Sequence, residues 1–429
     1  MSLSTPDLLL MRLLVGLLLF AVIPPLAAVQ QAPGAPAESL FVAGRFEEAQ
    51  EAFLARWAVD STDYRAALRL GTIGLYGNRL GDAERWLSRA LALAPDSARP
   101  KTLLAEARYR GNDFGGAVTM LRATNATLRA SKLESFSGRT PYEIAGAVDV
   151  VRIPFVQTDP LPIVAGGING VDTLFFLIDT GGGEVLVDTA LGRALGAVTF
   201  GQRTGVFAGG TAPVTEARVD SVRLGGFTVR NVPVGLLDMT RIGAAVGHRV
   251  DGIIGTILLY HFLPTLDYPK GELVLRRRTP EMRAQFEREA AAQNTVAQPF
   301  WLAGDHFMFA WGQVNGRPPV LLFVDTGLAG GGFVCSEQAA RDYGIDLSKT
   351  QTAEGVGGAG PTRVTWFTVD SLSMGPVTGR NIRGALGTLL FRAAFGFDAG
   401  GIISHQFFRP YALTFDFDAM RLYLTPGTR

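Results

Sequence analysis

The chain has 429 residues, enough for about three domains of ordinary size. Hydrophobic residues make up 47% of the sequence and charged residues 18%, which excludes wholesale disorder. The 40 Lys and Arg residues nearly balance the 39 Asp and Glu residues, so the net charge of +1 offers no electrostatic footprint for nucleic acid. One cysteine, Cys335, excludes an internal disulfide and, with only four histidines, leaves little for a Cys/His zinc site. We expect no metal and no cofactor.

The amino terminus predicts export. An apolar run at residues 13–23 follows Arg12 and precedes a Pro- and Ala-rich segment at residues 24–28. This run is short for a membrane span, which needs about 20 residues, and is typical of a secretory signal. We predict a signal peptide at residues 1–28 and a Pro-, Ala- and Gln-rich linker at residues 29–37. An uncleaved membrane anchor is the alternative, and both predict an exported, periplasmic or secreted protein.

A spacing of 34 residues recurs between residues 38 and 130. The recurring positions are Phe46, Leu80 and Phe114, and likewise Ala49, Ala83 and Ala117. This period, with Gly at the turns and Ala where helices touch, predicts stacked helical hairpins and resembles tetratricopeptide repeats. The resemblance implies a concave groove that docks a peptide or protein partner. A stacked spacer or a dimerisation arm is the alternative.

The rest of the sequence contains two similar copies of one unit. Short runs rich in Val, Ile, Phe and Thr, separated by Gly and Asn turns, predict β-strands. The matched segments are 169–181 with 315–327, 219–222 with 369–372, and 252–255 with 401–404. We predict a first lobe at residues 145–278 and a second at residues 297–429, joined by a charged, helical-looking linker at residues 279–296.

Each copy has the same order of features. A hairpin turn leads into an apolar strand that ends in Asp-Thr-Gly, followed by a Gly-rich middle and a Gly-Ile-Ile segment. This order resembles the retropepsin-like aspartic peptidases, and two such units in one chain resemble the two-lobed pepsin-like fold. The resemblance spans roughly residues 150–429. It implies a multidomain protein: an α-helical, tetratricopeptide-like repeat followed by an all-β, bilobal acid-protease fold of two duplicated lobes.

The resemblance implies that Asp179 and Asp325 form a catalytic dyad. Peptide hydrolysis without a metal or a covalent nucleophile needs one group to take a proton from water and another to donate one to the carbonyl oxygen. Two neighbouring carboxyls do both, because they share a proton. Either Asp alone is typical of a turn after a strand, so the aligned pair carries the prediction. By the same resemblance, the loops are supported by Thr180, Gly181, Thr326 and Gly327.

Gly-rich stretches in the two copies, at residues 201–215 and 355–361, are candidate flaps that close over a peptide and exclude water. The candidate flap residues are Phe207, Gly209, Gly210, Gly357 and Gly358. Mobile Gly-rich loops without that role are the alternative. The sequence departs from the family pattern after each Asp-Thr-Gly, where residues 182–184 and 328–330 lack the usual Ser or Thr. We expect weaker activity or a shifted pH dependence.

The sequence therefore predicts an exported aspartic endopeptidase that acts on peptide or protein substrates, with helical repeats that dock a substrate or partner. We expect no nucleic-acid partner, and membrane contact only through an uncleaved amino terminus. Two alternatives stay open. One is a catalytically inactive peptide-binding protein, and the other is a scaffold in which the helical repeats carry the biological role.

Overall fold

The computed structural model describes residues 36–207, 210–357 and 359–427. The predicted signal peptide and residues 29–35 of the predicted linker lie outside the described residues, whereas Ala37, the last linker residue, already belongs to the first helix. Residues 36–429 form one compact unit. Of the helices in the described part of the chain, none combines the length and the apolar character that a membrane crossing requires.

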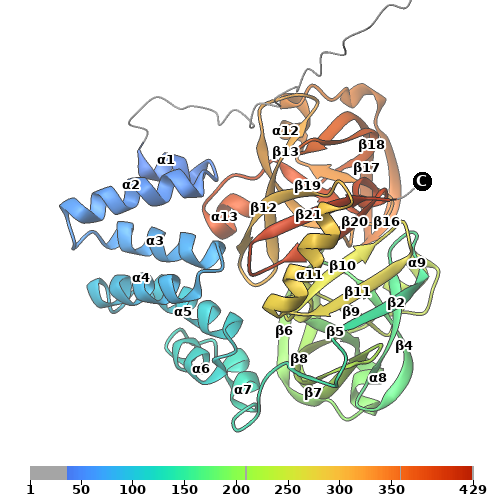
Figure 1. The fold of residues 1–429 in the computed structure, drawn as a ribbon, viewed down its shortest axis with the longest axis horizontal. Coiled ribbons are helices and arrows are strands. Elements are labelled where there is room, and N and C mark those ends of the chain that lie inside the picture. Colours follow the sequence, from blue (N-terminus) through green and yellow to red (C-terminus); the bar gives the residue numbers. More distant parts are fainter. Residues whose placement is uncertain (1–35, 208–209, 358, 428–429) are drawn as a thin grey trace, which may run out of the picture. The chain divides into compact units, whose positions relative to one another are not determined.

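The helical region runs from residue 37 to residue 134 and is coloured blue to teal in Figure 1. Its helices are α1 (Ala37–Val42), α2 (Phe46–Val59), α3 (Tyr64–Tyr76), α4 (Leu80–Leu93), α5 (Ala98–Arg110), α6 (Phe114–Arg122) and α7 (Thr127–Glu134). Helix α7 extends beyond residue 130, where we expected the repeats to end.

The 34-residue spacing corresponds to helix starts. Phe46, Leu80 and Phe114 are the first residues of α2, α4 and α6. The preceding turns contain left-handed residues at the same spacing, namely Gly44 (φ 73°), Asn78 (φ 54°) and Asn112 (φ 61°). Gly and Asn tolerate this conformation better than other residues, so the repeat is a repeat of turn geometry as well as of packing. The three equally spaced alanines, Ala49, Ala83 and Ala117, are fully buried.

The β region follows in two halves. The first half has β1 (Glu143–Ala145), β2 (Val150–Gln157), β3 (Ile163–Ile168), β4 (Val171–Ile178), β5 (Val185–Asp188), β6 (Val198–Phe207), β7 (Gly210–Leu224), β8 (Phe227–Leu237), β9 (Gly252–Ile254), β10 (Phe262–Asp267) and β11 (Glu272–Arg277), with α8 (Thr189–Ala194), α9 (Thr240–Val246) and α10 (Thr256–Leu259). Helix α11 (Pro280–Ala291) occupies most of the predicted inter-lobe linker.

The second half has β12 (Val296–Ala303), β13 (Phe307–Val314), β14 (Val320–Asp325), β15 (Phe333–Cys335), β16 (Gln351–Gly357), β17 (Gly360–Met374), β18 (Val377–Leu386), β19 (Gly401–Ser404), β20 (Tyr411–Asp416) and β21 (Arg421–Pro426), with α12 (Glu337–Asp342), α13 (Phe391–Phe395) and α14 (His405–Phe408). Because short helices interrupt both halves, the region is β-rich, and the expectation of an all-β region was too strict.

The strands around each Asp-Thr-Gly have the same pairing. In the first half, β4 runs parallel to β9, and β5 lies between β8 and β9. In the second half, β14 runs parallel to β19, and β15 lies between β18 and β19. Asp179 follows β4 directly and Asp325 is the last residue of β14, so both emerge at the carboxyl end of a buried strand.

A six-stranded antiparallel sheet joins the halves, in the order β2, β11, β10, β20, β21, β12. At its centre, Thr265 of β10 pairs with Thr414 of β20, and their hydroxyl oxygens are 2.7 Å apart. These two residues are separated by 149 positions, which is also the spacing between the two Gly-Ile-Ile segments. Matching positions of the two halves therefore meet at the middle of the shared sheet.

The helical region packs on the β region through its inter-helix turns. Phe46 contacts Trp301 with ring centroids 5.0 Å apart. Asn78 Nδ2 donates to the Phe417 carbonyl at 2.7 Å, and Arg110 Nη2 donates to the Gly304 carbonyl at 2.5 Å. The helical region thus contacts the β region at several points between α2 and α5.

Candidate active site

The loops after β4 and β14 bring the two Asp-Thr-Gly segments together. The Gly181 amide donates to Asp179 Oδ1 at 2.8 Å, and the Gly327 amide donates to Asp325 Oδ1 at 2.8 Å. A Cβ built on Gly181 would lie 2.4 Å from Asp325 Cγ, and one built on Gly327 would lie 2.3 Å from Asp179 Cγ. Each carboxyl therefore lies against the glycine of the opposite loop, where any larger residue would collide with it.

The two threonines bind each other's backbone. The Thr180 amide donates to Thr326 Oγ1 at 3.0 Å, and the Thr326 amide donates to Thr180 Oγ1 at 3.0 Å. Thr180 Oγ1 in turn donates to the Val324 carbonyl at 3.1 Å. Both side chains are fully buried, so these bonds are shielded from water and hold the two loops in a fixed relation.

The surroundings favour the protonated form of both carboxyls. Burial raises the pKa of Asp179 above its ordinary value, against the amide hydrogen bonds from its own loop. Burial and then the negative charge of Asp179 raise the pKa of Asp325 well above its ordinary value. Both residues keep partial exposure to solvent. Such a pair holds one proton between its members over a range of pH.

Two hairpins occupy the positions predicted for flaps. Phe207 ends β6 and Gly210 begins β7, while Gly357 ends β16; Gly209 and Gly358 lie outside the described residues. A Cβ on Gly210 would lie 3.9 Å from Ala359 Cβ, so the first residue of β7 lies close to the residue that precedes β17. Phe207 is partly buried against apolar residues of the first half.

Two polar residues that were not predicted as part of the site support the loops. Thr256 Oγ1 donates to the Thr180 carbonyl at 2.9 Å, and Ser404 Oγ donates to the Asp325 carbonyl. Ser404 is the last residue of β19 and Thr256 lies two residues after β9, and these two strands run parallel to β14 and β4. Their place at or directly after the end of the matched segments 252–255 and 401–404 is a signal that could have identified them.

A buried ion-pair cluster beside the loop after Asp179 was not predicted either. Lys132 Nζ of α7 lies 2.6 Å from Glu184 Oε2 and also contacts Glu216 of β7. A lysine in a short helix is ordinarily a surface residue, so the sequence carried no signal for this contact. Within the described ranges, no group of three or more His, Cys, Asp and Glu side chains forms a potential metal site.

A family model described as aspartyl protease matches residues 164–257 and 310–389, which include one Asp-Thr-Gly each. The two matches support an aspartic peptidase, and therefore a peptide hydrolase. A comparison with curated proteins finds no match.

Three solved structures are similar to parts of the chain. A retropepsin-like aspartic protease from Rickettsia conorii is 18% identical and covers 31% of this chain and 90% of its own, with a TM-score of 0.23. Conglutin gamma, a basic 7S globulin from lupine seeds, is 9% identical over 65% of this chain and 95% of its own, with a TM-score of 0.40. Basic 7S globulin from soybean is 9% identical over 66% and 95%, with a TM-score of 0.38. At these TM-scores the three structures do not by themselves define the fold.

Proposed function

We propose that the protein is an aspartic endopeptidase in which Asp179 and Asp325 jointly activate a water molecule. The observation that carries this proposal is the reciprocal contact in which each carboxyl lies against the glycine of the opposite loop. That contact keeps the two groups close enough to share a proton, and the paired threonines keep the loops from separating.

The chemistry follows from a pair that holds one proton. The ionised carboxylate takes a proton from water as the water oxygen attacks the peptide carbonyl carbon, and the protonated carboxyl gives its proton to the carbonyl oxygen. In the resulting gem-diol, the newly protonated carboxyl donates to the amide nitrogen while the other carboxylate takes a hydroxyl proton. The C–N bond then breaks, giving a carboxylic acid and an amine and restoring the singly protonated pair. The two hairpins exclude bulk water from these steps.

Cleavage of a mixed peptide library tests the proposal. We expect wild-type protein to cleave, and Asp179→Asn and Asp325→Asn each to lower kcat by about 10²- to 10⁴-fold while remaining folded, because Asn is nearly isosteric. Asp370→Asn, an exposed carboxyl in the second half, is the matched control and should keep full activity. Undiminished cleavage by either active-site variant would refute the dyad. Peptide binding without cleavage by wild type would favour the inactive peptide-binding alternative.

We further propose that the two halves are duplicated lobes and that the helices are tetratricopeptide-like repeats which dock a substrate or partner. The shared strand pairing and the recurrent left-handed turn residues support these assignments. A variant lacking only residues 36–134 tests the docking role if its β region folds. It should lose binding to a protein substrate while still cleaving short peptides.

Export of the protein is a separate proposal, based on the apolar run at residues 13–23. Expression in a bacterial host with cell fractionation and amino-terminal sequencing tests it. Cleavage near Ala28 and recovery outside the cytoplasm are expected, whereas a cytoplasmic, uncleaved product would contradict it.

A further inference from the structure

Lys132 is a charged side chain in the interior of the protein. It lies on α7 and is 1% exposed, and its ammonium group contacts the carboxylates of Glu184 and Glu216. A buried charge is costly unless it is paired and hydrogen-bonded, and here two anions compensate for one cation. The Lys132 ammonium group is therefore stabilised in the interior by these two carboxylates.

The two carboxylates belong to parts of the candidate active site. Glu184 ends the loop that begins with Asp179, and its Oε1 also accepts a hydrogen bond from the Tyr109 hydroxyl at 2.9 Å. Glu216 lies on β7, in the stem of the first flap hairpin, and pairs with Arg203 of the opposite strand β6. Burial opposes ionisation of Glu216, yet Lys132 and Arg203 lower its pKa below the ordinary value. Lys132 thus connects the loop to both strands of the hairpin.

A second cation of the same helix, Arg129, is linked to the loop through Asp305 and His306. Arg129, three residues before Lys132, lies 3.7 Å from Asp305, which is 2.6 Å from His306 Nδ1. A Cβ on Gly183 would lie 3.1 Å from that ring nitrogen. The loop is therefore in contact with residues linked to α7 at two consecutive positions, Gly183 and Glu184.

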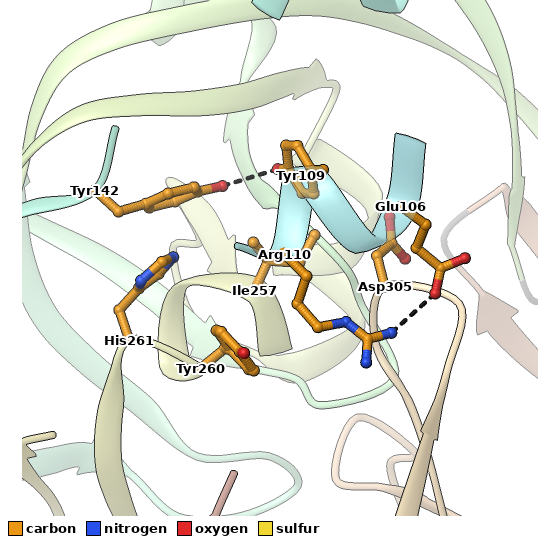
Figure 2. Close-up of a pocket in the computed structure, with 8 residues that line it drawn as sticks. All are labelled: Glu106, Tyr109, Arg110, Tyr142, Ile257, Tyr260, His261 and Asp305. Carbon is orange, nitrogen blue, oxygen red and sulfur yellow. Dashed lines mark hydrogen bonds and ion pairs between the residues drawn. The ribbon is translucent and has the colours of Figure 1, made fainter. Parts of the chain in front are cut away.

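The helices and the β region leave little space at this junction. Figure 2 shows Tyr109 and Tyr142, whose hydroxyls are 3.0 Å apart, beside His261 and Asp305 around a cavity of about 10 Å³. Such a volume is roughly what a single water molecule needs. The close fit means that a displacement of α5 would be transmitted to the residues of the β region that line this cavity.

The second half makes the corresponding connection in a different way. Trp366 lies 150 residues after Glu216, at the offset that relates Val219 to Val369. A Cβ on Gly331, in the loop after Asp325, would lie 3.1 Å from the Trp366 ring, and Arg383 stacks over that ring at 3.9 Å. In the second half, loop and hairpin stem touch directly. In the first half they are joined through a residue of the helical region.

We propose that Lys132 is a positioning residue that couples the helical region to the active site, by holding the loop after Asp179 against the stem of the first flap hairpin. For its effect on catalysis this inference rests on the proposed function. Its structural part does not, because the coupling has a readout in the hairpin itself.

Hydrogen exchange of the full-length chain is the primary test. Lys132→Met keeps most of the side-chain volume but leaves Glu184 and Glu216 without their shared cation. We expect amides in residues 180–188 and 198–224 to exchange about tenfold faster or more, because one partner of a buried ion pair is lost. Residues 351–374, the second hairpin, should keep the wild-type rate. Lys349→Met, whose lysine side chain is 83% exposed, is the matched control and should change neither segment.

Peptide cleavage is the second readout. Lys132→Met should lower kcat/KM by roughly ten- to a hundredfold, since the reacting groups lose alignment, and Lys132→Arg should restore part of the loss. If Lys132→Met does not fold, Lys132→Met combined with Glu184→Gln and Glu216→Gln removes the opposing charges together and undergoes the same exchange test. Unchanged exchange in residues 180–188 and 198–224 would overturn the inference. If Lys132→Met exchanges faster but the wild-type protein cleaves no peptide, the result would support the coupling and reject only the proposed function.

Discussion

The two halves of the β region share strand pairing but differ in one cluster of side chains. The cluster lies between β3, β4 and α9 in the first half and between β13, β14 and α13 in the second. In the first half five of these side chains are aliphatic, with Phe175 and Phe207 packed against the same cluster, and in the second half the five matching side chains are aromatic. The aliphatic residues are Leu161, Ile163, Leu177, Ile242 and Val246, and the residues at the matching offsets are Phe307, Phe309, Phe323, Phe391 and Phe395. Ile163 pairs with Leu177 across β3 and β4, as Phe309 pairs with Phe323 across β13 and β14.

The helical region covers the aromatic cluster of the second half. Phe397 packs against Phe46 and Tyr76, with ring centroids 5.1 and 5.8 Å apart, and the Tyr76 hydroxyl donates to the Phe395 carbonyl at 3.3 Å. At the position of Phe397, the first half has the partly exposed His248, beside an open cavity of about 550 Å³. Large aromatic side chains bury more area than aliphatic ones. One backbone arrangement thus serves as a docking base in the second half, whereas in the first half the position that matches Phe397 lies beside an open cavity.

The largest predicted loss, a loss of activity, should be the same in both halves. Gly181→Ala and Gly327→Ala each place a methyl group within 2.4 Å of the opposite carboxyl carbon, so one carboxyl must move. We expect kcat/KM to fall by about a hundredfold or more in each variant. Gly81→Ala is the control, because a Cβ there meets no atom within 4 Å. Activity that survives in one variant only would mean that the halves contribute unequally.

The next effect should differ between the halves. Phe397→Ala removes a fully buried ring at the base of the helical region and should lower the free energy of unfolding by about 3–5 kcal/mol. His248→Ala, at the matching position of the first half, should change it by about 0.5 kcal/mol or less. Urea unfolding at one pH measures both. Equal losses would contradict the asymmetric docking.

A pH-dependent effect should follow from Asp325. Because its pKa is raised, the folded protein holds this proton more tightly than the unfolded chain. The stabilisation is fully present below the ordinary carboxyl pKa of 3.8 and is lost as the pH rises through the raised value. Asp325→Asn cannot ionise, so the stability of the variant relative to wild type should rise across this window, by at most about 1.4 kcal/mol per pH unit. Asp370→Asn should show no such trend.

The smallest predicted loss, a loss of stability, should again be similar in both halves. Asn169 and Asn315 both have φ of 48°, and each side chain binds backbone groups of a neighbouring strand and loop. Replacement by Gly keeps the left-handed turn but removes these hydrogen bonds, at a cost of about 1 kcal/mol or more in each half. Asn294→Gly, an exposed left-handed residue, should be nearly neutral. Thermal unfolding of the three variants compares them.

Much of the candidate site was predictable because its parts recur at a fixed offset. Asp179 and Asp325, with the threonines and glycines that follow them, are visible as a linear pattern repeated after 146 residues. The helix starts at Phe46, Leu80 and Phe114 were predictable for the same reason.

Contacts without a repeat were not predictable. Lys132 meets Glu184 and Glu216 across 52 and 84 positions, and no periodicity relates a short helix to a loop and a strand. The pairing of β10 with β20 likewise depends on how the two halves meet, which the sequence of neither half encodes alone. The match between Glu216 and Trp366 was hidden because the two residue types share no chemistry.

The titration of the two carboxyls tests the central claim most directly and needs no substrate. Carbon-13 NMR of Asp-labelled protein, with Asp179→Asn and Asp325→Asn for assignment, follows each group as the pH changes. If the pair shares a proton, Asp325 in wild type should titrate well above its ordinary value of 3.8, and its pKa should fall in Asp179→Asn, where the neighbouring charge is gone. Two carboxyls that titrate independently near 3.8, with no response to each other's removal, would contradict the account.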